Sequence, residues 1–224
     1  MDSPWRTPAT VAGFTASPPN ETLIRFAARE MFRLEHPWAV DIGCGAARNA
    51  VPLAEGGWTV VGIDDSMPML TAAAERARKA GVAERCLVAL ATMDALPMRS
   101  GLADLIIAHG IWNLARSAAE FRRAVREAAR VAKPGAALFV FTFSRTTLPP
   151  EAQPVAGEPF VFTQFSGQPQ CFLTGAQLVA ELSEGGFDPD PGVPLRELNV
   201  PPPGTRRMGG PPIIYEGTFR RRPE

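Results

Sequence analysis

The chain has 224 residues, of which 46% are hydrophobic and 21% charged, enough for one globular core and too little for two comfortable domains. Lys and Arg together number 23, as do Asp and Glu, so no net charge favours nucleic acid as a partner. No apolar run approaches the ~18 residues that a membrane span needs, and the three cysteines lack the spacing of a zinc site or a disulfide framework. We therefore expect a single cytoplasmic domain over residues 1–224, with no membrane, nucleic-acid or metal partner.

The first predicted element is a helix that follows a leader rich in Pro, Ser and Thr. Asn20 ends this leader and is a good N-cap for a helix over residues 21–35, where apolar side chains recur at helical spacing. We expect the leader itself to be mobile. Leader and helix together, residues 1–36, are predicted to form an N-terminal lid.

Strands and helices alternate over the next segment, residues 37–145, which is predicted to be the cofactor-binding core. Short apolar runs typical of buried strands occupy residues 39–43, 58–63, 85–91, 103–110 and 136–143. Helical patterns lie between them at residues 49–57, 66–81 and 116–133. This alternation predicts an α/β doubly wound, Rossmann-like sheet that binds its ligand at the carboxyl ends of the strands.

The composition changes after residue 145. Residues 146–172 are predicted to be an irregular or hairpin insertion over an acceptor site, and residues 173–224 to hold the last helix and a pair of C-terminal strands. These strands, at residues 193–198 and 213–221, leave no room for a crossover helix and must pair antiparallel. A mostly parallel sheet therefore gains an antiparallel end.

A glycine turn joins the first strand of this core to its helix in the stretch "VDIGCGAARNAVPLA". Gly43 and Gly45 permit close approach of a nucleotide to the backbone, and Asp64 at the end of the second strand can accept both ribose hydroxyl hydrogens. A dinucleotide enzyme needs Gly or Ala where Arg48 stands, because the helix start must meet a pyrophosphate. S-adenosylmethionine has no phosphate, and its charged amino acid end favours a carboxylate such as Asp41.

Five stretches resemble, in order and at normal spacing, the motifs of class I S-adenosylmethionine-dependent methyltransferases: "VDIGCGAARNAVPLA", "VVGIDDSMPML", "MDALPM", "ADLIIAHGIWNLA" and "AKPGAALFVFTF". The resemblance covers about residues 38–145. It implies S-adenosyl-L-methionine as the cofactor and a sheet of seven strands whose last strand is antiparallel. An Arg-Asn pair after the glycine loop looks most like the small tellurite-resistance and thiopurine methyltransferase group.

This resemblance also implies roles for cofactor-binding residues. Asp41, Gly43 and Gly45 would hold the methionine portion, and Asp64 the ribose. Thr92 stands where the family commonly carries an acid for the adenine amine, and Asp65 where it usually places an apolar residue. The adenine would then be held by the backbone N–H of Met93 and by Asp94.

Acceptor-side candidates follow the fourth strand and lie in the insertion. His109 would lie close to the methyl group and the acceptor, where an imidazole can act as a general base; the alternative is a buried histidine satisfied by a backbone carbonyl. Trp112 and Asn113 would contact the acceptor, unless Trp112 only anchors a helix to the sheet. Gln164 and Gln168 would line a neutral roof over it, unless the segment is a half-buried hairpin.

The sequence therefore predicts methyl transfer, by in-line displacement and without a metal, to a small-molecule O, N, S or metalloid acceptor. Two alternatives stay open: a non-catalytic module that binds S-adenosylmethionine, and a nicotinamide-dependent oxidoreductase, against which Arg48 counts.

Overall fold

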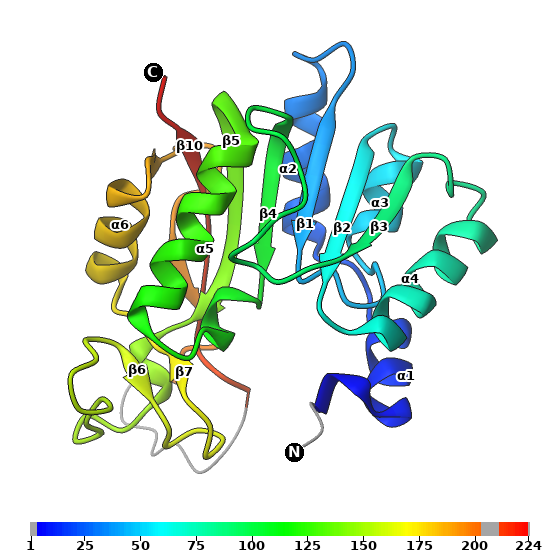
Figure 1. Ribbon diagram of the computed structural model, residues 1–224. Coiled ribbons are helices and arrows are strands. Elements are labelled where there is room, and N and C mark those ends of the chain that lie inside the picture. The colour runs from blue at the N-terminus through cyan, green and yellow to red at the C-terminus, as the bar shows by residue number, and fades with distance from the viewer. Residues whose placement is uncertain (1–3, 203–210, 224) are drawn as a thin grey trace.

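A twisted sheet runs through the centre of the molecule, in a computed structural model that describes residues 4–202 and 211–223 (Figure 1). Its strand order is β3-β2-β1-β4-β5-β10-β8, and β9 also pairs with β10. The bounds are β1 Trp38–Ile42, β2 Thr59–Asp64, β3 Cys86–Leu90, β4 Ala103–His109, β5 Ala132–Phe143, β8 Phe187–Pro189, β9 Arg196–Leu198 and β10 Ile214–Arg221.

Strands β1 to β5 are parallel, whereas β10 runs antiparallel to β5, β8 and β9. β8 and β9 share one edge of β10, because Arg221 pairs with Phe187 at one end of that strand and Ile214 with Leu198 at the other. The prediction of a mostly parallel Rossmann-like sheet of seven positions with an antiparallel C-terminal strand is confirmed. The antiparallel pairing of β9 with β10 is confirmed as well.

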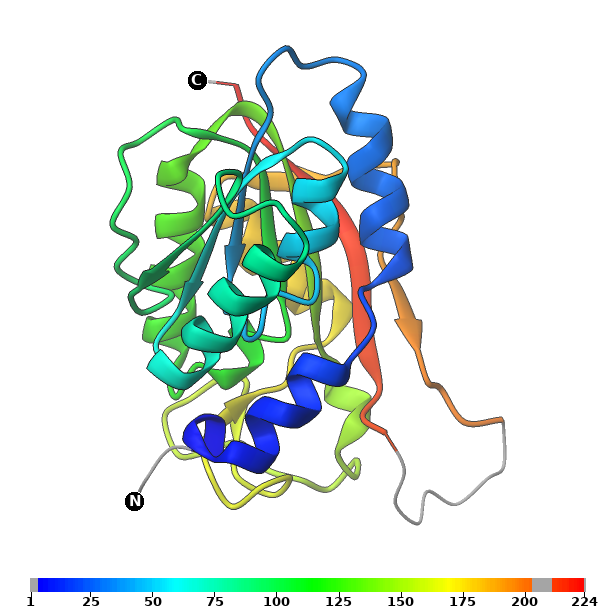
Figure 2. The same cartoon turned by 90° about the vertical axis from the view of Figure 1, so that its right-hand side faces the viewer.

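Helices cover both faces of the sheet. α2 (Glu21–Met31), α3 (Ala50–Glu55) and α4 (Met67–Lys79) pack on one face, and α5 (Ala118–Val131) and α6 (Gly175–Glu184) on the other. Figure 2 shows α2 and α5 on opposite sides of the strands. Among the described residues, no helix combines the length and apolar character that crossing a membrane requires.

The apolar stripe of α5 illustrates why these residues form this layer. Phe121, Val125 and Ala128 recur at helical spacing and are buried against strand residues such as Ile106 and Leu138. Ser117 caps the helix by accepting a hydrogen bond from the backbone N–H of Glu120. Amphipathic periodicity and a good cap thus suffice to define this helix.

The leader contains two helical segments. It forms a short 3-10 helix, Pro4–Arg6, and then α1, Pro8–Ala16, with Thr7 as the N-cap and Pro8 in the first turn. No residue of α1 is fully buried, and polar contacts join the leader to α4 and to its N-cap Ser66. The hydroxyl of Ser66 donates to the backbone oxygen of Trp5, 2.9 Å away, and Arg76 donates to that of Thr15.

The insertion folds back on itself as a two-stranded antiparallel hairpin, β6 (Val161–Phe162) and β7 (Gln170–Cys171), preceded by a 3-10 turn at Arg145–Thr147. Phe162, Phe172 and Leu148 form a small apolar cluster of its own beside Phe143 at the end of β5. The hairpin is therefore held at the β5 side of the sheet.

Candidate functional site

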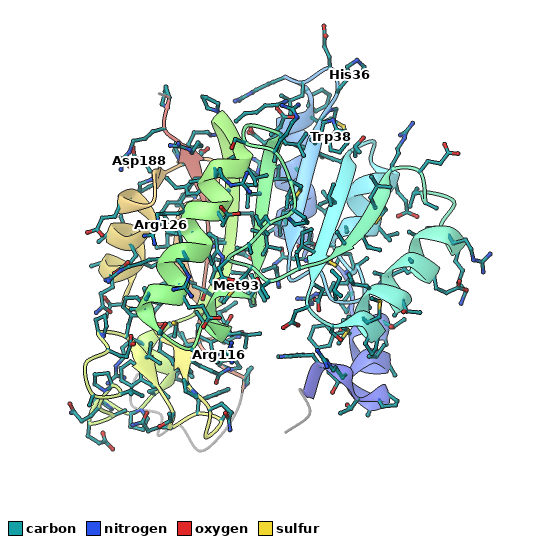
Figure 3. The ribbon with its side chains drawn as sticks, in the orientation of Figure 1. His36, Trp38, Met93, Arg116, Arg126 and Asp188 are labelled. Carbon is teal, nitrogen blue, oxygen red and sulfur yellow. The ribbon has the colours of Figure 1, made fainter. Side chains whose placement is uncertain are left out.

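A pocket of about 360 Å³ lies at the carboxyl ends of β1, β2 and β4. Of the residues predicted to bind the cofactor or to act in catalysis, five line it: Gly43, Gly45, Asp64, Met93 and His109. In Figure 3, Met93 and Arg116, which both line the pocket, lie far below His36 and Trp38 at the other end of the sheet. The fold thus places this pocket where a doubly wound sheet binds its ligands.

The glycine turn after β1 has no room for side chains. Gly43 and Gly45 have φ of 70° and 52°, in the left-handed region that favours glycine. A Cβ atom on Gly43 would lie 2.7 Å from the side chain of Ile111. A Cβ on Gly45 would lie 3.3 Å from the ring of Phe14. The backbone itself therefore forms this wall of the pocket.

Asp64 connects this turn to the end of β2. Its Oδ2 accepts a hydrogen bond from the backbone N–H of Gly45, and its Oδ1 accepts one from that of Ser66, both at 2.9 Å. Burial raises the pKa of this carboxyl group, and the two N–H donors oppose the rise. The carboxylate is thus held in a fixed orientation on the pocket wall, where it can accept hydroxyl hydrogens.

Asp41 lies behind the turn, near the end of β1. It is 1% exposed, and its Oδ2 has no hydrogen-bond partner within the residues that the structure describes. Burial raises its pKa to about 7; the charge of Arg48 opposes this rise and that of Asp64 adds to it. A buried carboxylate oxygen without a donor is costly unless a ligand supplies one. The ammonium group of S-adenosylmethionine fits that need.

His109 ends β4 and is enclosed by groups that the sequence did not connect to it. Nη2 of Arg48 lies 3.0 Å from its Nδ1, and Nδ2 of Asn20 lies 3.2 Å from its Nε2. The ring stacks on Phe141, with ring centroids 4.1 Å apart. Burial first, and then the charge of Arg48, lower the pKa of this imidazole to about 3.

The leader contributes two aromatic side chains that the sequence reasoning missed. Trp5 and Phe14 line the pocket on the side of the glycine turn, and their rings meet edge to face with centroids 5.5 Å apart. Their aromatic side chains, in a leader rich in Pro, Ser and Thr, were the available signal. α1 therefore acts as a wall of the pocket.

The adenine side differs from the expectation at Asp94. Thr92 and Met93 line the pocket, as does the exposed Asp65. Asp94 does not, because its Oδ2 accepts a hydrogen bond from Nε of Arg123 on α5, 3.1 Å away. The structure thus turns this carboxylate toward α5 and does not bring it to the pocket.

Trp112 and Asn113 do not line the pocket either. They lie in a 3-10 turn, Trp112–Leu114, where both side chains are buried. Trp112 packs edge-on against Phe121, with ring centroids 5.9 Å apart. This geometry matches the alternative in which Trp112 anchors the helix to the sheet.

Gln164 and Gln168 lie exposed in the hairpin, away from the pocket lining. Nε2 of Gln164 donates to the backbone oxygen of Gln153 at 2.9 Å, and the backbone N–H of Gln168 donates to Ser166 Oγ. Since the aromatic cluster around Phe172 holds the hairpin at the end of β5, these amides do not form a roof in this structure.

Comparison with known proteins agrees with this geometry. Residues 40–140 match the family model of a methyltransferase domain. A demethylmenaquinone methyltransferase of Mycobacterium marinum is 28% identical over 165 residues, which cover 66% of this chain and 66% of that protein. The chain thus spans slightly less than two thirds of the length of this curated relative.

Two solved structures share the fold. An S-adenosylmethionine-dependent methyltransferase from Methanosarcina mazei has a TM-score of 0.66 and 20% identity, with 85% of this chain and 95% of that one covered. The Burkholderia thailandensis 1,6-didemethyltoxoflavin-N1-methyltransferase, with 1,6-didemethyltoxoflavin and S-adenosylhomocysteine bound, also has a TM-score of 0.66, at 15% identity and with 99% and 93% covered. The chain is thus similar to methyltransferases over residues 40–140, and it shares its fold with both solved structures.

Proposed function

We propose that this protein transfers a methyl group from S-adenosylmethionine to a small-molecule acceptor. The observation that carries the proposal is the buried Asp41 carboxylate, whose Oδ2 has no partner among the described residues, beside a turn that cannot accept a side chain at Gly43. A carboxylate in this position suits an ammonium group, and a bare backbone suits close contact with the rest of the ligand.

Each wall of the pocket has a role in this proposal. Asp41, which lies behind the turn and outside the pocket lining, would pair with the ammonium group. The turn at Gly43 and Gly45 would contact the methionine portion, and Asp64 would accept the ribose hydroxyl hydrogens. The backbone of Met93 would meet the adenine. Trp5 and Phe14, which line the pocket, would exclude water from the cofactor.

The cofactor supplies a methyl group bonded to a positively charged sulfur. A lone pair of the acceptor forms the new bond to the methyl carbon while the carbon–sulfur bond breaks, and the electron pair of that bond stays on sulfur. Holding two reactants in near-attack geometry is worth ~7–11 kcal/mol in favourable cases. We therefore assign most of the rate enhancement to alignment by the pocket walls.

A small acceptor is supported by the solved structure of similar fold that holds 1,6-didemethyltoxoflavin. The likeness to the tellurite-resistance and thiopurine group is part of the proposal and rests on the Arg48–Asn49 pair alone. The acceptor atom, among O, N, S and metalloid, is taken up below.

Mass spectrometry of small molecules retained by the purified protein tests the cofactor, with S-adenosylmethionine or S-adenosylhomocysteine expected. Calorimetric titration measures the affinity for S-adenosylhomocysteine, and Asp41→Asn is expected to bind it more weakly. Tight binding without turnover on a broad acceptor panel would favour the non-catalytic module. Binding of NADH with no response to S-adenosylmethionine would favour the oxidoreductase.

A further inference from the structure

The imidazole of His109 lies between two hydrogen-bond donors that come from distant parts of the sequence. Arg48 precedes α3 and approaches Nδ1 at 3.0 Å, whereas Asn20 precedes α2 and approaches Nε2 at 3.2 Å. Phe141 of β5 covers one face of the ring. Both ring nitrogens are therefore engaged by the protein itself.

The orientation of the Asn20 amide follows from its other contacts. Its Oδ1 accepts a hydrogen bond from the backbone N–H of Leu23 at 2.9 Å, which caps α2. Its Nδ2 donates to Oε2 of the buried Glu216 at 2.8 Å. A flipped amide would lose the cap and turn its oxygen toward a carboxylate, so the amide presents a donor to His109.

These contacts determine the protonation state of the ring. Arg48 and the Asn20 amide both donate, so each ring nitrogen faces a donor, and the one N–H of a neutral imidazole already meets a donor on whichever nitrogen carries it. A second proton would set N–H donors against both Arg48 and Asn20, and would add a positive charge beside the guanidinium. The lowered pKa of His109, about 3, agrees with this geometry.

Other charges near this group belong to the same network. Asp41 interacts electrostatically with Arg48, and Arg196 lies 4.0 Å from Glu216. Asp41 thus attracts the Arg48 guanidinium, and Glu216 accepts a hydrogen bond from the Asn20 amide. The arrangement keeps the donors in place around a neutral imidazole.

We propose that Arg48, Asn20 and Glu216 form a clamp that holds His109 neutral, so that His109 is a positioning residue and accepts no proton during methyl transfer. The inference rests on the proposed function. It makes the acceptor a nucleophile whose lone pair is already free at neutral pH, such as an aromatic ring nitrogen, a thioether or a thiolate. Aliphatic alcohols and ammonium groups, which need a base, fall outside this class.

The remaining acids on the pocket wall do not replace His109 as a base. Both oxygens of Asp64 accept backbone hydrogen bonds, and Glu120 accepts one from the backbone N–H of Arg116 at 2.7 Å. Asp65 is exposed beside the adenine side of the pocket. Carboxylates are in any case weak bases toward an alcohol or an ammonium group.

Nitrogen-15 NMR of the intact protein tests the clamp without any substrate. The chain has two histidines, and His36 lies exposed at the opposite end of the sheet, so it provides an internal reference signal that His36→Asn assigns (Figure 3). We expect the His109 ring signals to be those of a neutral imidazole from about pH 5 to about pH 8, on both sides of the usual histidine pKa. A titration midpoint of His109 within that range would overturn the proposal.

Asn20→Ser is the sharpest variant, because Ser caps a helix about as well as Asn does and places no second carboxylate beside Glu216. It removes the amide donor beside Nε2, and should raise the titration midpoint of His109 toward the ordinary range of histidine. Thr174→Ser, at the N-cap of α6, is the matched control that should leave the His109 signal unchanged. An unchanged signal in Asn20→Ser would also overturn the clamp.

The acceptor class is tested by the pH dependence of kcat/KM for acceptors of different pKa. The inference is supported if kcat/KM rises with pH at the pKa of each acceptor. It is contradicted if kcat/KM rises near neutral pH for every acceptor and this rise disappears in His109→Asn. Failure of S-adenosylmethionine to bind would remove the proposed function alone, because the NMR measurement decides the clamp independently.

Discussion

The side chain of Ile111 occupies the space that a Cβ atom on Gly43 would need, with 2.7 Å between the two positions. Ile111 follows β4 and Gly43 follows β1, so the contact joins two strand ends across the pocket. Any side chain at Gly43 would have to displace Ile111 and would also be strained by its φ of 70°.

Gly43→Ala should therefore lower the free energy of unfolding by about 1–3 kcal/mol, as overpacking usually does, and weaken S-adenosylhomocysteine binding at least about 10-fold. Denaturant unfolding and calorimetry measure the two effects. Gly13→Ala in α1, where a Cβ meets nothing within 4 Å, is the control that should neither lower stability nor weaken binding. Unchanged binding in Gly43→Ala would mean that this turn is not the cofactor wall.

Asp41→Asn should stabilise the ligand-free protein while weakening cofactor binding. Because burial raises the Asp41 pKa from 3.8 to about 7, the folded protein loses stability as pH rises from the lower value through the upper one. An uncharged Asn avoids a penalty on the order of 4 kcal/mol at about pH 8, and less at about pH 5. Thermal unfolding at both pH values checks whether Asp41→Asn is more stable than the wild type and by how much more at the higher pH.

Asp41→Asn should also change the pH dependence of S-adenosylhomocysteine binding. In the wild type, S-adenosylhomocysteine affinity should rise from about pH 6 to about pH 8 as Asp41 ionises, since the charged carboxylate is the form that pairs with an ammonium group. Asp41→Asn should bind at least about 10-fold more weakly and lose this pH dependence. A variant that keeps it would place the titrating group elsewhere.

Phe14→Ala should reduce cofactor affinity with little effect on stability. Phe14 lines the pocket, yet α1 buries no residue in the core, so its truncation removes a wall without opening a core cavity. We expect S-adenosylhomocysteine to bind about 10-fold more weakly and the free energy of unfolding to change by less than about 1 kcal/mol. Equal affinity for both proteins would show that α1 does not cover the bound ligand.

Asp94→Ala distinguishes the structure from the sequence-based assignment of this residue to the adenine site. The carboxylate pairs with the half-exposed Arg123, so its loss should cost at most about 1 kcal/mol of stability and leave cofactor affinity within about 3-fold. Calorimetry decides the point. A large loss of affinity would mean that Asp94 leaves Arg123 when the ligand binds.

The parts of the fold that depend on local pattern could be predicted from the sequence. Periodic apolar residues such as Phe121 and Val125 mark the buried face of α5, and the short connections near the end of the chain require antiparallel strands. Glycines at the β1 turn and Asp64 at the end of β2 lie where a doubly wound sheet places them. In these cases the local sequence and the tertiary fold favour the same conformation.

Features that depend on distant partners could not be predicted. α1 has no apolar stripe to reveal it, and contacts such as that between Ser66 and Trp5 determine its position. Asn20 was recognisable as an N-cap, but nothing near it in the sequence indicates Glu216. Asp94 carries no local sign that it pairs with Arg123, which lies 29 residues away.

The hydrogen bond between Asn20 and Glu216 joins residues 196 positions apart, and this has a consequence for how the protein acquires its activity. Such long-range contacts form late, because the loop-closure entropy must be overcome before they contribute. During synthesis, α2 and β1 leave the ribosome long before β10 does. A chain whose parallel strands have already assembled therefore still lacks the Glu216 contact that orients the Asn20 amide beside His109, because that contact forms only when β10 pairs with β5.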